Sequence, residues 1–193
     1  FAADIDGDGD MDVLSASFGD NTIAFYQNGD GTSGDGDGSS WTETEITTGA
    51  SGAQSVFAAD IDGDGDMDVL SASRNDDTIA FYQNGDATSG DGDGSAWTKI
   101  EITTGANRPG SVFAADIDGD GDMDVLSASQ FDNTIAFYRN GDETSGNGDG
   151  SAWTKIEITT GASRFRSIFA VDIDGDGDPD VLSASFNDDT IAW

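Results

Sequence analysis

A repeat of 56 residues runs through the whole chain and restricts the folds open to it. The segment Ala2–Ser17 (AADIDGDGDMDVLSAS) recurs letter for letter at Ala58–Ser73 and Ala114–Ser129, and a fourth copy, Ala170–Ser185, differs at two positions. A period of this length indicates one supersecondary unit packed against copies of itself. The chain is therefore one predicted region, residues 1–193, with three full repeats and a partial fourth: about 1–54, 55–110, 111–166 and 167–193.

Each repeat predicts four strands and no helix. In the second repeat the β-prone segments are Ser55–Ile61, Val69–Ser73, Thr78–Gln83 and Trp97–Thr104, each rich in β-branched, aromatic or alternating residues. Four strands in a repeat of this length predict an all-β fold of β-propeller blades, each a four-stranded antiparallel sheet. A linear β-solenoid is the alternative architecture, although its coils are usually shorter and lack a meander of hairpins.

The strands of a repeat differ in character, and this predicts their order in a blade. In the fourth strand the charged Lys99 and Glu101 alternate with apolar residues, which fits an outermost, solvated position. The small residues Ser71–Ser73 of the second strand fit the crowded region nearer the axis. Because a closed propeller needs about four to eight blades, we expect further blades in a longer chain, or self-association, to complete the ring.

The connection between the first and second strands of each repeat is a run of alternating aspartates. In the first repeat, Asp4, Asp6, Asp8, Asp10 and Asp12 occupy loop positions 1, 3, 5, 7 and 9, with a glycine at position 6. Calcium takes six to eight oxygen ligands, and carboxylates at positions 1, 3 and 5 followed by this glycine let a short loop wrap around the ion. We expect Asp10 to offer its backbone carbonyl and Asp12 to close the shell with both carboxylate oxygens.

The same pattern predicts four Ca²⁺ ions, one in each repeat. The predicted ligands are Asp4, Asp6, Asp8, Asp10, Asp12, Asp60, Asp62, Asp64, Asp66, Asp68, Asp116, Asp118, Asp120, Asp122, Asp124, Asp172, Asp174, Asp176, Asp178 and Asp180. Pro179 replaces the methionine of the other copies and removes no carboxylate, so we expect the fourth site to be retained. Two carboxylates 4 Å apart repel by about 1 kcal/mol in water and about 4 kcal/mol at an effective dielectric constant of 20. Without a cation, we therefore expect each loop to open.

Other interpretations of the loop fit the sequence less well. An EF-hand has an acidic residue at position 12 and flanking helices, whereas strands flank these loops and position 12 is a serine, Ser15 in the first repeat. Magnesium prefers to keep several waters. A solvated acidic turn without any ion would need the same carboxylates to converge in every repeat with nothing to offset their repulsion.

Composition excludes several functions. The 7 Lys and Arg stand against 39 Asp and Glu, giving a net charge of -32, which rules out nucleic-acid binding by counterion release and attraction to anionic membranes. With no His and no Cys, the chain has no disulfide, thiolate zinc site or histidine catalysis, and we predict that it is not an enzyme. It contains neither a signal peptide nor an apolar run that could insert into a bilayer. The repeat pattern is already running at Phe1 and Trp193, so we expect a fragment of a longer protein.

The motif DxDGDGxxD between two strands, in repeats that begin with a Phe-Ala-Ala-Asp-like strand, resembles the FG-GAP/VCBS repeats of integrin α-chain propellers and of many secreted microbial proteins. The resemblance covers all four copies. It implies calcium between the first two strands of a blade and an extracellular or cell-surface setting with a role in binding or adhesion. The chain departs from integrin propellers, which usually have seven blades, in its blade count, and it lacks clear copies of the Gly-Ala-Pro signature.

The predicted function is therefore a calcium-binding extracellular β-propeller module for adhesion or protein interaction, in which Ca²⁺ stabilises each blade. One alternative is a carbohydrate-binding propeller of lectin type, and another is an accessory propeller of a secreted polysaccharide-active enzyme. The partner, a protein or a glycan, is not identified by the sequence.

Two weaker signals accompany the loops. A second acidic loop, Gly34–Gly38 in the first repeat, reads either as an extra cation site using Asp35 and Asp37 or as a hairpin loop. The tryptophans at one repeat position could stack on sugars, but we expect them to pack between blades; they are Trp41, Trp97 and Trp153.

Strand alternation also predicts two different ends of the blades. Both acidic loops should lie at one end, and the turns and linkers in which the repeats differ most should lie at the other. The variable residues are Phe18, Arg74, Gln130, Phe186, Gln54, Arg108, Phe165 and Arg166. Because variable loops on a rigid scaffold often carry function, we expect this end to meet the ligand; neutral variation at exposed positions is the alternative.

Overall fold

The computed structural model describes residues 1–29, 34, 36–85, 92–141, 148–161 and 164–193. Strands are the only regular secondary structure of these residues, and they pair into four antiparallel sheets whose strand order follows the chain. No helix in this part of the chain is available to cross a membrane. The predicted all-β fold is confirmed.

The strand bounds repeat from sheet to sheet. The first sheet contains β1 (Ala2–Ala3), β2 (Asp12–Ser17), β3 (Thr22–Asn28) and β4 (Trp41–Thr47), and the second contains β5 (Ala53–Ala59), β6 (Asp68–Ser73), β7 (Thr78–Asn84) and β8 (Trp97–Thr103). The third contains β9 (Pro109–Ala115), β10 (Asp124–Ser129), β11 (Thr134–Asn140) and β12 (Trp153–Thr159), and the fourth contains β13 (Phe165–Val171), β14 (Asp180–Ser185) and β15 (Thr190–Ala192). In the second sheet, the first strand begins and ends two residues earlier than Ser55–Ile61, and the other strands agree with the prediction to within one residue.

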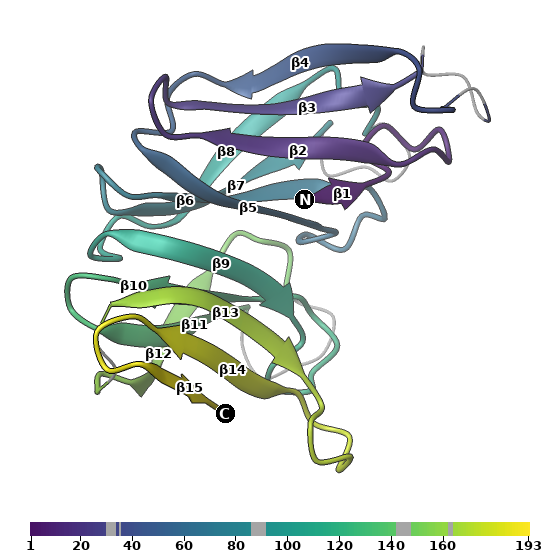
Figure 1. The fold of residues 1–193 in the computed structure, drawn as a ribbon. Coiled ribbons are helices and arrows are strands. Elements are labelled where there is room, and N and C mark those ends of the chain that lie inside the picture. The colour runs from purple at the N-terminus through teal and green to yellow at the C-terminus, as the bar shows by residue number, and fades with distance from the viewer. Residues whose placement is uncertain (30–33, 35, 86–91, 142–147, 162–163) are drawn as a thin grey trace.

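The four sheets follow one another in a series, with the first and fourth at its two ends, and the described residues do not close into a ring (Figure 1). Their first strands adjoin along the series, as a row of equivalent phenylalanines shows. Ring centroids are 4.4 Å apart for Phe1 and Phe57, 4.5 Å for Phe57 and Phe113, and 4.6 Å for Phe113 and Phe169. The fourth strands β4, β8 and β12 form the opposite edge of each complete sheet, as expected from their charged residues.

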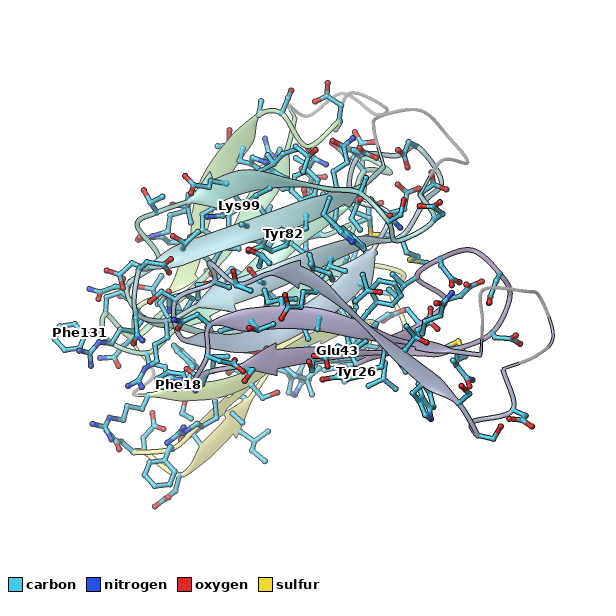
Figure 2. The ribbon with its side chains drawn as sticks, turned by 90° about the horizontal axis from the view of Figure 1, so that it is seen from above. Phe18, Tyr26, Glu43, Tyr82, Lys99 and Phe131 are labelled. Atoms are coloured by element: carbon cyan, nitrogen blue, oxygen red, sulfur yellow. The ribbon has the colours of Figure 1, made fainter. Side chains whose placement is uncertain are left out.

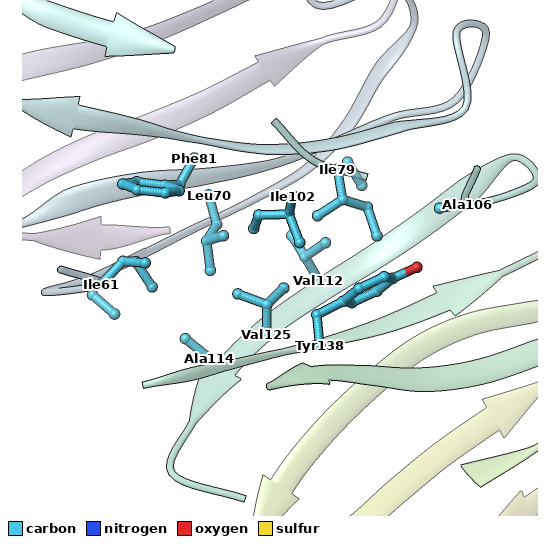
Figure 3. Packing of buried hydrophobic residues seen from close by; sticks show 12 residues of the cluster. Ile61, Leu70, Ile79, Phe81, Ile102, Ala106, Val112, Ala114, Val125 and Tyr138 are labelled. Atoms are coloured by element: carbon cyan, nitrogen blue, oxygen red, sulfur yellow. The ribbon is translucent and has the colours of Figure 1, made fainter. Parts of the chain in front are cut away.

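The core lies between neighbouring sheets. Between the second and third sheets, Leu70, Ile79 and Phe81 meet Val112 and Val125 in one buried cluster (Figure 3). Each pair of neighbouring sheets repeats this arrangement. Consequently β6 and β10, which have a sheet on both sides, are buried along their whole length, whereas β14 in the fourth sheet is only partly buried.

Candidate metal centre

Each aspartate loop connects the first and second strands of its sheet, and its own backbone holds its carboxylates. In the second repeat, Gly65 has φ of 99°, a conformation that favours glycine, and its amide donates to Asp60 Oδ2 at 3.0 Å. The amide of Asp64 donates to Asp62 Oδ1 at 3.2 Å, and that of Asp66 to Asp64 Oδ1 at 2.9 Å. The loop is thus curled by bonds from amides to the side chains two to five residues earlier.

Asp68, at position 9, closes the loop from inside the protein. Its Oδ2 accepts the amide of Ile61 at 3.0 Å and its Oδ1 accepts the amide of Asn84 at 3.0 Å. The side chain is fully buried, and this burial raises its pKa to about 7, against the two amides, which lower it; charges of neighbouring loop aspartates raise it further. Asp12 and Asp124 are equally buried, and burial raises the pKa of Asp124 to about 6.

Three of the five predicted ligands converge in every loop. In the first loop positions 1, 3 and 5 come together, and in the other three loops positions 1, 3 and 9 do so. Within each group, carboxylate oxygens lie within 4.8 Å of one another: Asp4, Asp6 and Asp8; Asp60, Asp62 and Asp68; Asp116, Asp118 and Asp124; and Asp172, Asp174 and Asp180. Several oxygens at these sites are buried and have no hydrogen-bond partner among the described residues: Asp4 Oδ1, Asp8 Oδ2, Asp64 Oδ2 and Asp120 Oδ2.

Position 7 connects the aspartate loop to the second acidic loop. Asp66 Oδ2 accepts the amide of Gly92 at 3.0 Å, and Asp10 Oδ2 accepts the amide of Gly36 at 2.8 Å. A Cβ on Gly92 would lie 2.5 Å from Asp66 Cβ, so only glycine permits this approach. The prediction that both loops lie at one end of the sheets is confirmed. The close approach to the position 7 aspartate explains why the second loop has glycine at this position.

The second loop is a turn where the structure describes it. Asp93 Oδ1 accepts the amide of Ser95 at 3.0 Å, and Asp37 Oδ1 accepts that of Ser39 at 2.9 Å. None of the acidic groups brought together among the described residues includes these two aspartates. Asp35 lies outside the described residues, so the extra cation site predicted with it stays a prediction.

The third loop differs from the first two in one contact. Gln83 Nε2 donates to Asp62 Oδ2 at 2.6 Å in the second repeat, and Gln27 makes the same bond to Asp6 in the first. In the third repeat an arginine takes this position, and Arg139 Nε forms an ion pair with Asp118 Oδ2 at 2.7 Å. The third loop therefore carries one neutralising charge of its own.

Neighbouring loops are also joined across the sheet interface. The side-chain amide Nδ2 of Asn84, at the end of β7, donates to the carbonyl of Ile5 in the preceding loop at 2.8 Å and to that of Gly92 at 3.1 Å. Asn140 makes the equivalent bond to the carbonyl of Ile61, also at 2.8 Å. Asn84 and Asn140 are fully buried. Sequence reasoning missed these asparagines, because an Asn-Gly pair after a strand reads as an ordinary turn.

The turns and linkers occupy the other end of the sheets, where Phe18 and Phe131 project (Figure 2). The amide of Arg74 donates to the carbonyl of Gly52 at 3.1 Å, which joins a turn to the linker before it. A cavity of about 250 Å³ opens at this end; its lining is Gln54, Arg74, Arg108, Gln130, Phe131, Arg164 and Arg166. Five of these were among the variable residues predicted to gather here.

Sequence reasoning missed two residues that line the cavity, and it wrongly included Phe165 among the residues expected to meet a ligand at this end. Arg164 aligns with Gly52 and Arg108 in the linkers, so repeat-to-repeat variation could have identified it, as it could have identified Phe131. The prediction was wrong for Phe165, which is fully buried rather than exposed, because it packs in the core between the third and fourth sheets.

The tryptophans pack between sheets, as predicted, where a preceding sheet exists. The Trp97 ring lies edge-on to Phe25 of the first sheet at 6.3 Å, and Trp153 meets Phe81 in the same way. Trp41, in the first sheet, has no such neighbour and is 45% exposed.

The fold and the loops define a class: a repeat protein of antiparallel sheets, four-stranded in the three full repeats, each with an aspartate-rich loop between its first two strands. Three overlapping stretches, residues 4–71, 60–127 and 117–183, match the FG-GAP-like repeat. The chain belongs to this family, as the resemblance of its loop motif indicated. No curated protein matches the chain in a sequence comparison.

Proposed function

We propose that the chain is a calcium-binding, extracellular β-propeller module for adhesion or protein interaction, and that one Ca²⁺ per repeat stabilises its sheets as blades. The convergence of the aspartates in all four loops is the observation that carries this proposal. Carboxylates held within 4.8 Å of one another in the folded chain repel strongly, and a divalent cation among them would turn this repulsion into attraction.

The donor set of the loops fits calcium. All the converging groups are carboxylates, which are hard oxygen ligands, and the buried oxygens without a hydrogen-bond partner, such as Asp64 Oδ2, are free to accept a cation. The residues that would hold the ion are those of positions 1, 3, 5 and 9. Position 7 would contribute only its backbone carbonyl, because its side chain, as at Asp66, is bonded to the second loop.

An ion in each loop would stabilise more than that loop. Asp68 and Asn84 connect the second loop to β7 and to the first loop, so holding the carboxylates together also fixes the contact between sheets. A site saturated a hundredfold above its Kd adds about 2.7 kcal/mol to the free energy of unfolding. Calcium loops of extracellular modules bind at about 10⁻⁴ to 10⁻³ M, which supports a calcium-rich, extracellular setting.

A propeller would also account for the apolar surface of the end sheets. Phe1, Phe169 and Ile191 are 48%, 49% and 81% exposed, whereas the equivalents Phe57 and Ile79 of the second sheet are half-buried and buried. Further blades or a second copy of the chain would cover these faces. We assign the module a binding role and not a catalytic one, because the carboxylates brought together among the described residues are those of the aspartate loops.

The test is a count of bound calcium together with thermal unfolding. We expect about four Ca²⁺ per chain after equilibrium dialysis, one fewer for Asp64→Asn, and a lower melting temperature in EGTA than in 2 mM Ca²⁺. Asp76→Asn removes a charge from an exposed turn of the same repeat and should keep all four ions. A chain that binds no calcium, or that melts at the same temperature in EGTA, would refute the proposal.

A further inference from the structure

The basic residues of this chain divide into two sets by their partners. Of the 7 Lys and Arg, Lys99, Lys155 and Arg139 pair with carboxylates at 2.7–3.0 Å. The other four line the cavity at the turn end of the sheets: Arg74, Arg108, Arg164 and Arg166. Within the described residues, none of these four forms an ion pair, although the chain has 39 acidic residues.

Aromatic rings, and not carboxylates, hold three of these guanidinium groups. Arg108 lies over Phe131 at 5.1 Å, Arg166 over Phe186 at 5.3 Å and Arg74 over Phe18 at 6.0 Å. Stacking on an aromatic face orients a guanidinium group and leaves its in-plane N–H donors available. The Nε of Arg74 is buried without a hydrogen-bond partner in the described structure, an arrangement that ordinarily indicates a missing acceptor.

The backbone at two of these positions is unfavourable for arginine. Arg108 and Arg164 have φ of 55° and 58°, at the linker position that Gly52 occupies with φ of 66° in the first linker. A residue with a side chain is less stable than glycine in this conformation. Repulsion among the arginines adds to this cost. The cavity therefore retains positive charge where the backbone does not favour arginine and where no carboxylate of the described residues pairs with the guanidinium groups.

We propose that this cavity binds an acidic sugar unit, a ring that bears a carboxylate or sulfate group. The guanidinium forks match the oxygens of such a group, the amides of Gln54 and Gln130 can bond hydroxyls, and the exposed ring of Phe131 offers an apolar face. A volume of about 250 Å³ is just below that of small-molecule sites, about 300–1,000 Å³, so one ring is accommodated and not an extended chain. The proposal names a ligand for the interaction module proposed above and depends on that role, but not on calcium binding.

The test is an NMR titration of the full chain in 2 mM Ca²⁺ with glucuronate, with glucose as the neutral ring and with inorganic sulfate as the anion without a ring. We expect saturable shifts with glucuronate and binding at least about tenfold weaker for the other two probes. Replacing Arg74 or Arg108 with glutamine should weaken glucuronate binding about tenfold, since one charge-assisted hydrogen bond is lost. Lys155→Gln removes the same charge far from the cavity and should leave binding unchanged.

Each variant is first checked for unaltered calcium-dependent melting, so that loss of binding is not loss of folding. Arg74 has an ordinary backbone conformation, which makes Arg74→Gln the variant least prone to misfold. The proposal is wrong if glucuronate gives no saturable shift, if glucose or sulfate binds equally well, or if Lys155→Gln weakens binding as much as Arg74→Gln. Any of these results with a normal calcium response would reject the sugar site and leave the calcium proposal standing.

Discussion

Replacing Asn84 with alanine should destabilise the protein more than the same change at Asn28, its equivalent in the first sheet. The side chain of Asn84 donates to the carbonyls of Ile5, Met67 and Gly92 and accepts the amide of Gly94, at 2.8–3.2 Å. Among the described residues, the side chain of Asn28 bonds only to its own second loop: it donates to the carbonyl of Gly36 and accepts the amide of Gly38. Asn84 therefore differs from Asn28 in two bonds: the one to the carbonyl of Ile5 in the preceding sheet, at 2.8 Å, and the longer one to the carbonyl of Met67 in its own repeat, at 3.2 Å.

The difference can be estimated from these bonds. A hydrogen bond contributes about 1 kcal/mol net, and a buried group left without a partner costs about 1–3 kcal/mol. Asn84→Ala leaves the carbonyl of Ile5 without this donor inside the interface, whereas Asn28→Ala does not. We therefore expect a loss of about 3–4 kcal/mol for Asn84→Ala and about 2 kcal/mol for Asn28→Ala. Asn140→Ala repeats the test, because Asn140 donates to the carbonyl of Ile61 at 2.8 Å.

Urea unfolding in saturating Ca²⁺, followed by circular dichroism, measures these free energies, provided that the slope m is the same for all variants. Equal losses for Asn84→Ala and Asn28→Ala would show that the bond across the interface contributes nothing. A loss for Asn140→Ala close to that of Asn28→Ala would contradict the reasoning in the same way.

Two further predictions follow from burial. In EGTA the free energy of unfolding should fall as pH rises from about 4 to 7. Folding raises the pKa of Asp68 from 3.8 to about 7 and that of Asp124 to about 6, so the folded state binds these protons more tightly than the unfolded state. The stabilisation present below pH 4 is therefore lost as each carboxyl group ionises. At 1.36 kcal/mol per pKa unit, Asp68 alone accounts for about 4 kcal/mol of this loss of stability. Calcium binds the ionised form and should abolish the loss. A gain in stability of the calcium-free protein between pH 4 and 7, measured by thermal melting, would contradict the prediction. Trp97→Ala should lower the free energy of unfolding in urea by about 2–3 kcal/mol, because the ring packs on Phe25 across the interface. The control Trp41→Ala removes a more exposed ring and should cost under about 1 kcal/mol. Equal costs would show that the contact of the indole ring with the preceding sheet does not stabilise sheet packing.

Local patterns predicted much of this fold. β-branched and aromatic runs such as Thr78–Gln83 lie almost where the strands begin and end, since strand propensity and turn residues act over a few positions. The convergence of Asp60, Asp62 and Asp68 followed from their spacing in one short loop. The end at which each connection lies followed from strand alternation alone.

Contacts between repeats could not be predicted in the same way. The bond from Asn84 to Ile5 joins residues 79 positions apart, and nothing in an Asn-Gly pair distinguishes a structural bridge from a turn. Phe165 looked exposed because it stands in a variable linker, but it is the first residue of β13, at a shift in strand register, and it belongs to the same core cluster as Leu126. Asp68 was expected to turn both oxygens to the ion, and each of them also accepts a backbone amide.

The way each end of the sheets is joined explains why the repeats are alike at one end and different at the other. At the aspartate end the connecting hydrogen bonds use side chains, such as the carboxylate of Asp68, which accepts the amide of Asn84. A substitution there removes the hydrogen bond. At the turn end the joints use backbone groups, such as the amide of Gln130 to the carbonyl of Arg108 at 3.0 Å. One side chain does take part there, the Oδ1 acceptor at Asn21, Asp77 and Asn133, and every repeat keeps an Asn or Asp at that position. Exposed turn and linker side chains outside this acceptor and the core can change without breaking a joint, unlike buried ones such as Phe165, so arginines could gather around one cavity there while the loops stayed the same.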